Sequence, residues 1–258
     1  MPRLNRYIAS SGLCSRRKAD ELIEQRKVNV NGKVITEPGF SVNDKDKVFV
    51  NQKLVRPVKH QYYKFYKPAG YITTSSDEKG RKTIYDLLPD SLANLKPAGR
   101  LDKASTGLLI LTNDGDLINE LTHPSVKVPK IYLVTINGRI SRRQLEQMAL
   151  GIEIEPDKTA YADVTVLEAD NKHTLMQITL HQGLNRQIRK MFEHLGFEVK
   201  SLKRIQHAAI TLDGLKKGEF KPIKPIQIKE LRFFLNKLKG LQSEQAMSRS
   251  VSRAGVKD

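Results

Sequence analysis

The sequence predicts an α+β fold, with a small first domain and a larger domain built on a mixed, largely antiparallel sheet with flanking helices. Segments that alternate apolar and polar residues are interspersed with three or four helical segments, without the regular strand–helix–strand repeat of a parallel sheet. The chain has 258 residues, enough for one domain of ordinary size and a small one. The proline-containing stretch 56–60 predicts the boundary, with domains at 1–60 and 61–235.

The composition predicts a polyanionic partner. The formal net charge is +17, from 45 Lys and Arg against 28 Asp and Glu. Such an excess of positive charge favours binding to phosphate groups, because the contacts release counterions. The single cysteine, Cys14, cannot form an internal disulfide, which is typical of a reducing cytoplasm. The six histidines lack metal-ligand spacing, so no metal is expected. No apolar run approaches 18 residues, so we expect neither a membrane span nor a secretory signal.

The first 60 residues predict two short helices followed by short strands. The first helix is expected at 3–9, and the second is expected to begin after Ser15 as its N-cap and to reach about Arg26. Arg16, Arg17 and Lys18 fill the first turn of this second helix, where positive charge opposes the helix dipole. A bound phosphate would offset that cost and use the free backbone N–H groups. The turn at 31–32 (Asn-Gly) then predicts a hairpin.

The stretch 3–35 resembles the RNA-binding domain first seen in ribosomal protein S4. Residues 1–60 contain 13 Lys and Arg against 6 Asp and Glu, which suits such a domain. The resemblance implies that the basic second helix faces structured RNA through Arg16, Arg17 and Lys18.

The larger domain has several elements that its apolar pattern predicts. Strands are expected at 62–66, 108–111, 130–140, 160–167, 175–180 and 197–202, and helices at 115–121 and from Ser141. A further helix is expected from Asn185, as its N-cap, to Gly196. Arg186, Arg189 and Lys190 are expected to form a basic ridge on this helix. The segment 236–258 lacks apolar periodicity, and we expect a disordered basic tail there.

One loop carries the strongest indication of chemistry. The stretch 97–115, PAGRLDKASTGLLILTNDG, places Arg100 and Asp102 before a small-residue turn and an apolar strand. Such a loop holds a carboxylate on a rigid scaffold. The stretch resembles the GRLD motif of RNA pseudouridine synthases, in the branch that contains the ribosomal enzymes RsuA, RluB, RluE and RluF. The resemblance implies that Asp102 is the catalytic residue.

Three further sequence features resemble this family in the expected order. Tyr132 lies in KIYLV, and the resemblance implies that its ring stacks on the target base and that it takes the proton from C5. Arg189 ends the Q-I-R motif, and its family counterpart pairs with the catalytic aspartate. Leu184 replaces the Lys or Arg usual in RsuA-type chains, which favours the RluF-like subset. The resemblance implies a monomeric enzyme without a cofactor that acts on ribosomal RNA, with the large subunit favoured and transfer RNA left open.

A single carboxylate suffices for this isomerisation. The uracil leaves C1′, rotates and rejoins through C5, so the second acid and the water of a glycoside hydrolase are not needed. Asp102 must be ionised, either to attack C1′ or to remove a C2′ proton, and the sequence leaves both open. A close guanidinium from Arg189 would lower its pKa by roughly 1 to 3 units. Arg100 is placed to fill the space that the flipped base vacates.

Two other classes of protein share part of this pattern. A non-catalytic RNA-binding or ribosome-assembly factor would use the same basic surfaces, including Arg186 and Lys190, but needs no combination of Asp102, Tyr132 and Arg189. A nuclease would require a cluster of metal-binding carboxylates, whereas only Asp114 and Asp116 lie near one another in the sequence. The joint presence of the three motif residues therefore favours an RNA pseudouridine synthase.

Overall fold

The computed structural model describes residues 1–43, 45–74 and 77–254. The chain divides into two compact units between Gln61 and Tyr62, and the short segment 112–115 belongs with the first unit. The α+β prediction is confirmed for both units. In the described part of the chain no helix is long and apolar enough to cross a membrane.

The first unit packs two helices on a small antiparallel sheet. The helices are α1 (Leu4–Ser10) and α2 (Arg16–Glu24), and the strands lie in the order β2 (Lys33–Val34), β1 (Val28–Val30), β3 (Val48–Val50) and β4 (Lys53–Val55). Helical spacing places Ala19, Leu22 and Ile23 of α2 in the buried core. The Ser15 hydroxyl accepts a hydrogen bond from the Lys18 N–H at 3.2 Å, which confirms the predicted N-cap.

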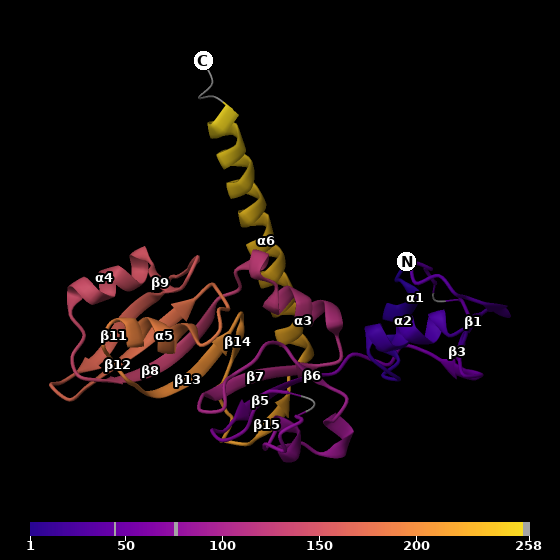
Figure 1. The fold of residues 1–258 in the computed structure, drawn as a ribbon, viewed down its shortest axis with the longest axis horizontal. Coiled ribbons are helices and arrows are strands. Elements are labelled where there is room, and N and C mark those ends of the chain that lie inside the picture. Colours follow the sequence, from indigo (N-terminus) through magenta and orange to yellow (C-terminus); the bar gives the residue numbers. More distant parts are fainter. Residues whose placement is uncertain (44, 75–76, 255–258) are drawn as a thin grey trace. The chain divides into compact units, whose positions relative to one another are not determined.

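The second unit is built on one large mixed sheet, whose strands are labelled in Figure 1. Its main path in the described residues runs β11 (Asp163–Ala169), β12 (His173–Leu180), β8 (Lys130–Asn137), β13 (Val199–His207), β7 (Thr106–Thr112), β5 (Tyr62–Lys67) and β15 (Phe220–Pro222). Short strands β6 (Lys96–Pro97) and β14 (Ile210–Thr211) pair with β7 and β13. Among the pairs whose register is defined, only β7–β13 is parallel, with Thr106 opposite Lys203 and Gly107 opposite Arg204.

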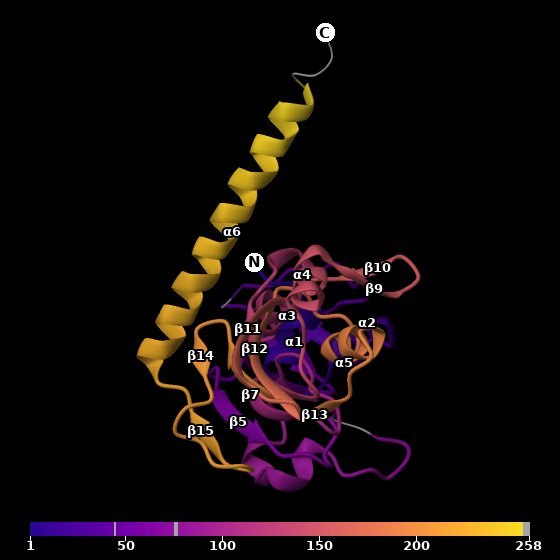
Figure 2. The same ribbon diagram turned by 90° about the vertical axis from the view of Figure 1, so that its left-hand side faces the viewer.

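Strand β7 separates two hydrophobic cores. Its buried residues alternate between them, with Leu109 and Leu111 in the first core and Leu108 and Ile110 in the second. The first core is covered by α4 (Arg142–Leu150) and α5 (Gln187–His194), the second by α3 (Gly115–Thr122) and α6 (Pro225–Ala254) (Figures 1 and 2). A strand buried on both faces reads as a continuous apolar run, which is why the segment 108–111 was recognisable in the sequence.

The remaining elements are short. A hairpin of β9 (Ile152–Glu155) and β10 (Lys158–Ala160) follows α4, and single 3₁₀ turns occur at Ile84–Leu87, Asp90–Leu92 and Pro124–Val126. Helix α4 begins at a capping box, in which Ser141 and Gln144 each bond to the other's backbone N–H. This arrangement confirms the predicted helix start at Ser141.

The prediction of a disordered tail is wrong for 236–254, because α6 continues to Ala254. Contacts with distant parts of the domain support the extension. Leu238 packs against the second core, Lys239 pairs with Glu120 at 2.8 Å, and the Gln242 side chain donates to the Val126 carbonyl at 2.6 Å. These partners lie more than a hundred residues earlier, so local periodicity could not reveal them. Residues 255–258 of the predicted tail lie outside the described residues.

Candidate active site

A cavity of about 540 Å³ opens on the first-core side of the large sheet. It is lined by the loop 99–102, Ser105, the residues 122–124 and 127–128, Lys130 and Tyr132 of β8, the segment 180–188, and Leu202 and Arg204 of β13. All of these residues belong to the second unit. The cavity is large enough for a flipped nucleotide, since ligand pockets commonly measure about 300–1,000 Å³.

The Asp102 loop is fixed from beneath by a buried lysine. The Lys67 ammonium donates to the carbonyl oxygens of Asp102 at 3.0 Å and Ser105 at 2.7 Å, and also to that of Pro68 at 3.0 Å. Burial lowers the pKa of Lys67 to about 8, assisted by the charge of Arg204 and opposed by that of Asp102. The Thr73 hydroxyl donates to the Leu101 carbonyl at 2.8 Å. The loop therefore presents Asp102 from a fixed backbone.

Asp102 is half-buried at the cavity wall. It is the one carboxylate among the described residues that line the cavity. Among those described, no side chain or backbone N–H forms a hydrogen bond or ion pair with its carboxylate oxygens. An anionic oxygen pair is thus available to a ligand in the cavity.

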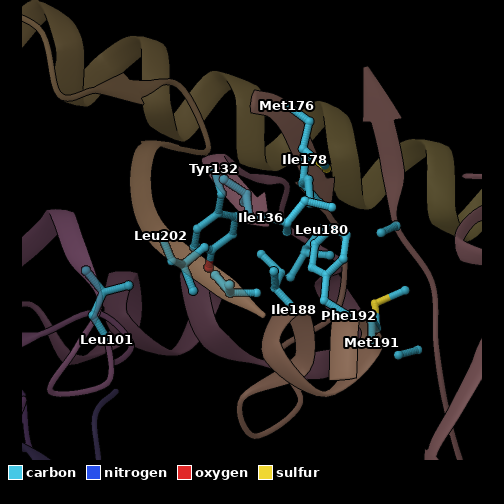
Figure 3. Close-up of a cluster of buried hydrophobic side chains, with 14 of the residues drawn as sticks. Leu101, Tyr132, Ile136, Met176, Ile178, Leu180, Ile188, Met191, Phe192 and Leu202 are labelled. Atoms are coloured by element: carbon cyan, nitrogen blue, oxygen red, sulfur yellow. The ribbon is translucent and has the colours of Figure 1, made fainter. Parts of the chain in front are cut away.

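Tyr132 lies on β8 and faces the same cavity, with 8% of its surface exposed. Figure 3 shows its ring beside Leu202 and Ile136 in the first core. Apolar neighbours of the first core pack against the ring and hold its orientation. Among the described residues, none forms a hydrogen bond with its hydroxyl. The structure therefore brings Asp102 and Tyr132 to one cavity.

Arg189 is not in contact with Asp102 in this structure. Its Nη1 donates to the Val199 carbonyl at 3.2 Å, and its Nε is buried without a partner. Its pKa is lowered, mainly by burial and then by the charge of Arg186, while the charge of Asp102 opposes the shift. Arg189 therefore lies within the electrostatic influence of Asp102, although no ion pair joins them among the described residues.

The predicted basic ridge on α5 does not exist as one surface. Arg186 lies before the helix in the left-handed region (φ 51°) and lines the cavity, whereas Lys190 pairs with Glu155 on β9. The helix begins at Gln187, so Asn185 is not its N-cap. The side chain of Gln187 instead donates to the Tyr161 carbonyl at 3.0 Å. This buried, nonlocal bond was not visible in the sequence.

The remaining predicted basic residues lie in two places. Arg100 is exposed at the cavity mouth, next to Asp102. Arg16, Arg17 and Lys18 are exposed in the first turn of α2, in the other unit, and no acidic residue stands in that turn. Lys18 also pairs with Glu21 at 2.6 Å, one turn later.

Sequence reasoning missed two cations in the cavity floor, Lys130 and Arg204. Arg204 is 1% exposed and donates from Nε to the Leu108 carbonyl at 2.7 Å, while its Nη2 has no partner. Lys130 is half-buried and donates to the Val128 carbonyl at 3.0 Å. Both stand on strands, where an isolated basic residue ordinarily faces solvent. The cavity thus holds five Lys and Arg side chains, at 100, 127, 130, 186 and 204, against the single carboxylate.

The same cavity region offers no metal ligand set. In the described residues no group of three or more His, Cys, Asp or Glu side chains could hold an ion.

Comparisons with known proteins agree on one family. The family model described as RNA pseudouridylate synthase matches residues 61–194, and that of the S4 domain matches residues 2–48. "Ribosomal large subunit pseudouridine synthase B" of Bacillus subtilis (strain 168) is 42% identical over 234 residues, covering 90% of this chain and 96% of that protein. "Dual-specificity RNA pseudouridine synthase RluF" of Escherichia coli (strain K12) is 40% identical over 224 residues, covering 86% and 75%.

A solved structure titled "Crystal structure of pseudouridylate synthase" is 29% identical with a TM-score of 0.65, and the match covers 90% of this chain and all of that one. The two identities of 42% and 40% are too near each other to place the chain in one subset. Because the family model covers more than half of the chain and the two relatives are 42% and 40% identical over most of it, this chain belongs to the RNA pseudouridine synthase family and carries an S4 RNA-binding domain before its catalytic domain.

Proposed function

We propose that this enzyme converts an unpaired uridine of ribosomal RNA into pseudouridine, with Asp102 as the catalytic carboxylate. The supporting observation is the position of Asp102, which is the one carboxylate at a strongly basic cavity and faces it without a polar partner among the described residues. The name of the Bacillus subtilis relative, a ribosomal large subunit pseudouridine synthase, favours large-subunit RNA. Asp102 and Tyr132 line one cavity without residues of a second copy, and we propose that the enzyme acts as a monomer.

The proposed reaction needs no external reactant. The N1–C1′ bond breaks, the uracil rotates within the cavity, C5 bonds to C1′, and the proton of C5 leaves as N1 gains one. Asp102 acts on the sugar, by attack at C1′ or by removal of a C2′ proton. Tyr132 holds the base by stacking, which recovers about 1 to 3 kcal/mol of the cost of flipping. Its unengaged hydroxyl is proposed to take the C5 proton as it gives its own proton to solvent, so that the phenol stays neutral overall.

The proposed roles of the basic residues follow from their places. Arg100 and Arg186, at the mouth of the cavity, contact the RNA backbone or fill the gap left by the flipped base. Arg189 supplies positive charge near Asp102. Arg16, Arg17 and Lys18 dock the S4 domain on folded RNA, since phosphates there meet a helix N-terminus. Lys190 has the weakest case for contact with RNA among these basic residues, because its ammonium forms an ion pair with Glu155.

The substrate is tested by a side-by-side assay of large-subunit, small-subunit and transfer RNA, with pseudouridine mapping of each. We expect one unpaired or bulged uridine of large-subunit RNA to react, and a fully paired version of its stem to react much more slowly, because opening the pair adds to the cost of flipping. Modification confined to the small subunit would overturn the substrate proposal. The transfer RNA arm decides whether a second substrate exists.

Two substitutions of Tyr132 separate its ring from its hydroxyl. Tyr132→Phe keeps the stacking ring, so we expect RNA binding within a few fold but product formation lowered by about 10²- to 10⁴-fold, the range for a positioned acid–base group. Tyr132→Leu should lose stacking as well. The measurement is tritium release from RNA labelled at C5 of uridine.

RNA with 5-fluorouridine at the target provides the control, because its C5 carries no proton to remove. Tyr132→Phe should rearrange this RNA at a rate near that of the unchanged enzyme. Equal tritium release by Tyr132→Phe and the unchanged enzyme would remove the hydroxyl from the mechanism.

A further inference from the structure

The floor of the cavity contains two cations that face one another without a carboxylate. Arg204 on β13 stands directly opposite Tyr132 on β8, and Lys130 precedes Tyr132 by two residues on the same face of that strand. Diagonal neighbours of this kind are roughly 7–8 Å apart at their backbones, within reach of long side chains. Neither cation forms an ion pair with any residue in the described ranges.

These two charges lie in an unfavourable setting until an anion joins them. The guanidinium of Arg204 is enclosed, and one of its amino nitrogens lacks any acceptor. Burial and the charge of Arg204 together lower the pKa of Lys130 to about 8. His207, opposite Lys130, is fully buried, and both cations help to keep its pKa well below the ordinary value, so it stays neutral. A buried cation without a counter-ion is unfavourable in free energy, and an anion bound at this point would offset that unfavourable term.

We propose that Lys130 and Arg204 form a subsite for one phosphate group of the flipped nucleotide, beneath the base held against Tyr132. The inference rests on the proposed function only in taking RNA as the ligand. A phosphodiester is the one anionic group of RNA, and its two free oxygens can accept from an ammonium and a guanidinium together. The subsite would fix the sugar between this phosphate and the Asp102 carboxylate.

The test compares uridine 5′-monophosphate with uridine as competitors of RNA binding. With the unchanged enzyme we expect the nucleotide to compete at least about tenfold better, the worth of one hydrogen bond to a charged group. Lys130→Gln should bring the two competitors close together, and Lys130→Arg should restore the difference because it keeps the charge. Lys172→Gln, at an exposed turn between β11 and β12, is the matched control and should resemble the unchanged enzyme.

The pH dependence of the same preference provides a second readout. Lys130 loses its proton as the pH rises through about 8, so the advantage of the nucleotide should fall in that range. Lys67 titrates in the same range, because burial lowers its pKa to about 8 as well. Lys130→Arg separates the two lysines, because its preference should persist above pH 8 if Lys130 is responsible.

Each result decides the inference. If the monophosphate competes no better than uridine against the unchanged enzyme, or if Lys130→Gln keeps the difference, the phosphate subsite is wrong. If Lys130→Gln weakens competition by uridine 5′-monophosphate and by uridine equally, the cations contact the base and not a phosphate. That result would also overturn the phosphate subsite. Arg204→Gln is less useful alone, since the loss of its bond to Leu108 can impair folding. The competition needs no turnover, so failure of the substrate proposal leaves this outcome readable.

Discussion

Replacement of Asp102 by asparagine is expected to lower pseudouridine formation by more than about 1,000-fold, toward the upper end of what one positioned group contributes. The amide is of nearly equal size but cannot attack C1′ or accept the C2′ proton. The loop itself should persist, because Lys67 and Thr73 hold backbone atoms and not the carboxylate. Single-turnover assays on the mapped RNA measure the loss.

RNA affinity is the control for Asp102→Asn. Removal of one negative charge from a cavity with five Lys and Arg side chains should leave binding within a few fold, or strengthen it slightly. Substantial turnover by this variant would show that the catalytic group lies elsewhere. A large loss of affinity together with turnover would instead indicate a structural role for the carboxylate.

Gly107→Ala is expected to destabilise the catalytic domain by about 3 to 5 kcal/mol, enough to unfold many domains. A Cβ at this position would lie 2.2 Å from the Arg204 carbonyl oxygen and 2.6 Å from its backbone nitrogen. Both atoms belong to a paired strand and cannot move aside as a flexible side chain could. The residue also has φ +109°, which L side chains rarely adopt.

Thermal melting followed by circular dichroism measures this effect, with Gly240→Ala as the matched substitution. Gly240 lies in α6 with no heavy atom within 4 Å of the added carbon, so alanine there should stabilise the helix by up to about 1 kcal/mol. A melting temperature of Gly107→Ala equal to that of the unchanged protein would contradict the close approach of β7 to β13. The S4 domain can melt separately, so the transition of the catalytic domain must be resolved.

The sequence predicted elements where local pattern and burial agree. The helix α5 followed from helical spacing, and its residues Ile188, Met191 and Phe192 are buried in the first core. The strand β7 followed from its continuous apolar run. Asp102 and Tyr132 were found through motifs, and the fold brings them to one cavity. Their roles in the reaction stay predictions.

The misses share a physical cause, which is dependence on distant partners. Lys67 is fully buried because four backbone carbonyls surround its ammonium, and three of them, at 102, 103 and 105, lie far along the chain. The apolar pattern of the sequence did not predict that Arg204 is buried, because the residue is basic. Its side chain is nevertheless held inside the sheet by a hydrogen bond to the Leu108 carbonyl. The extension of α6 likewise depends on Glu120 and Val126, far away in the chain. Such contacts become visible only once the topology is known.

The parallel pairing of β7 with β13 has a consequence for how the enzyme appears during its synthesis. The core of the S4 domain needs no residue beyond Val55, so it can close while the rest of the chain is still being made. The cavity requires Thr106 to meet Lys203, a contact of high sequence separation, and such contacts form slowly. At ordinary elongation rates the strand ending at His207 follows the end of the first domain by roughly 7 to 30 seconds. A growing chain therefore becomes able to hold RNA well before it becomes able to alter it.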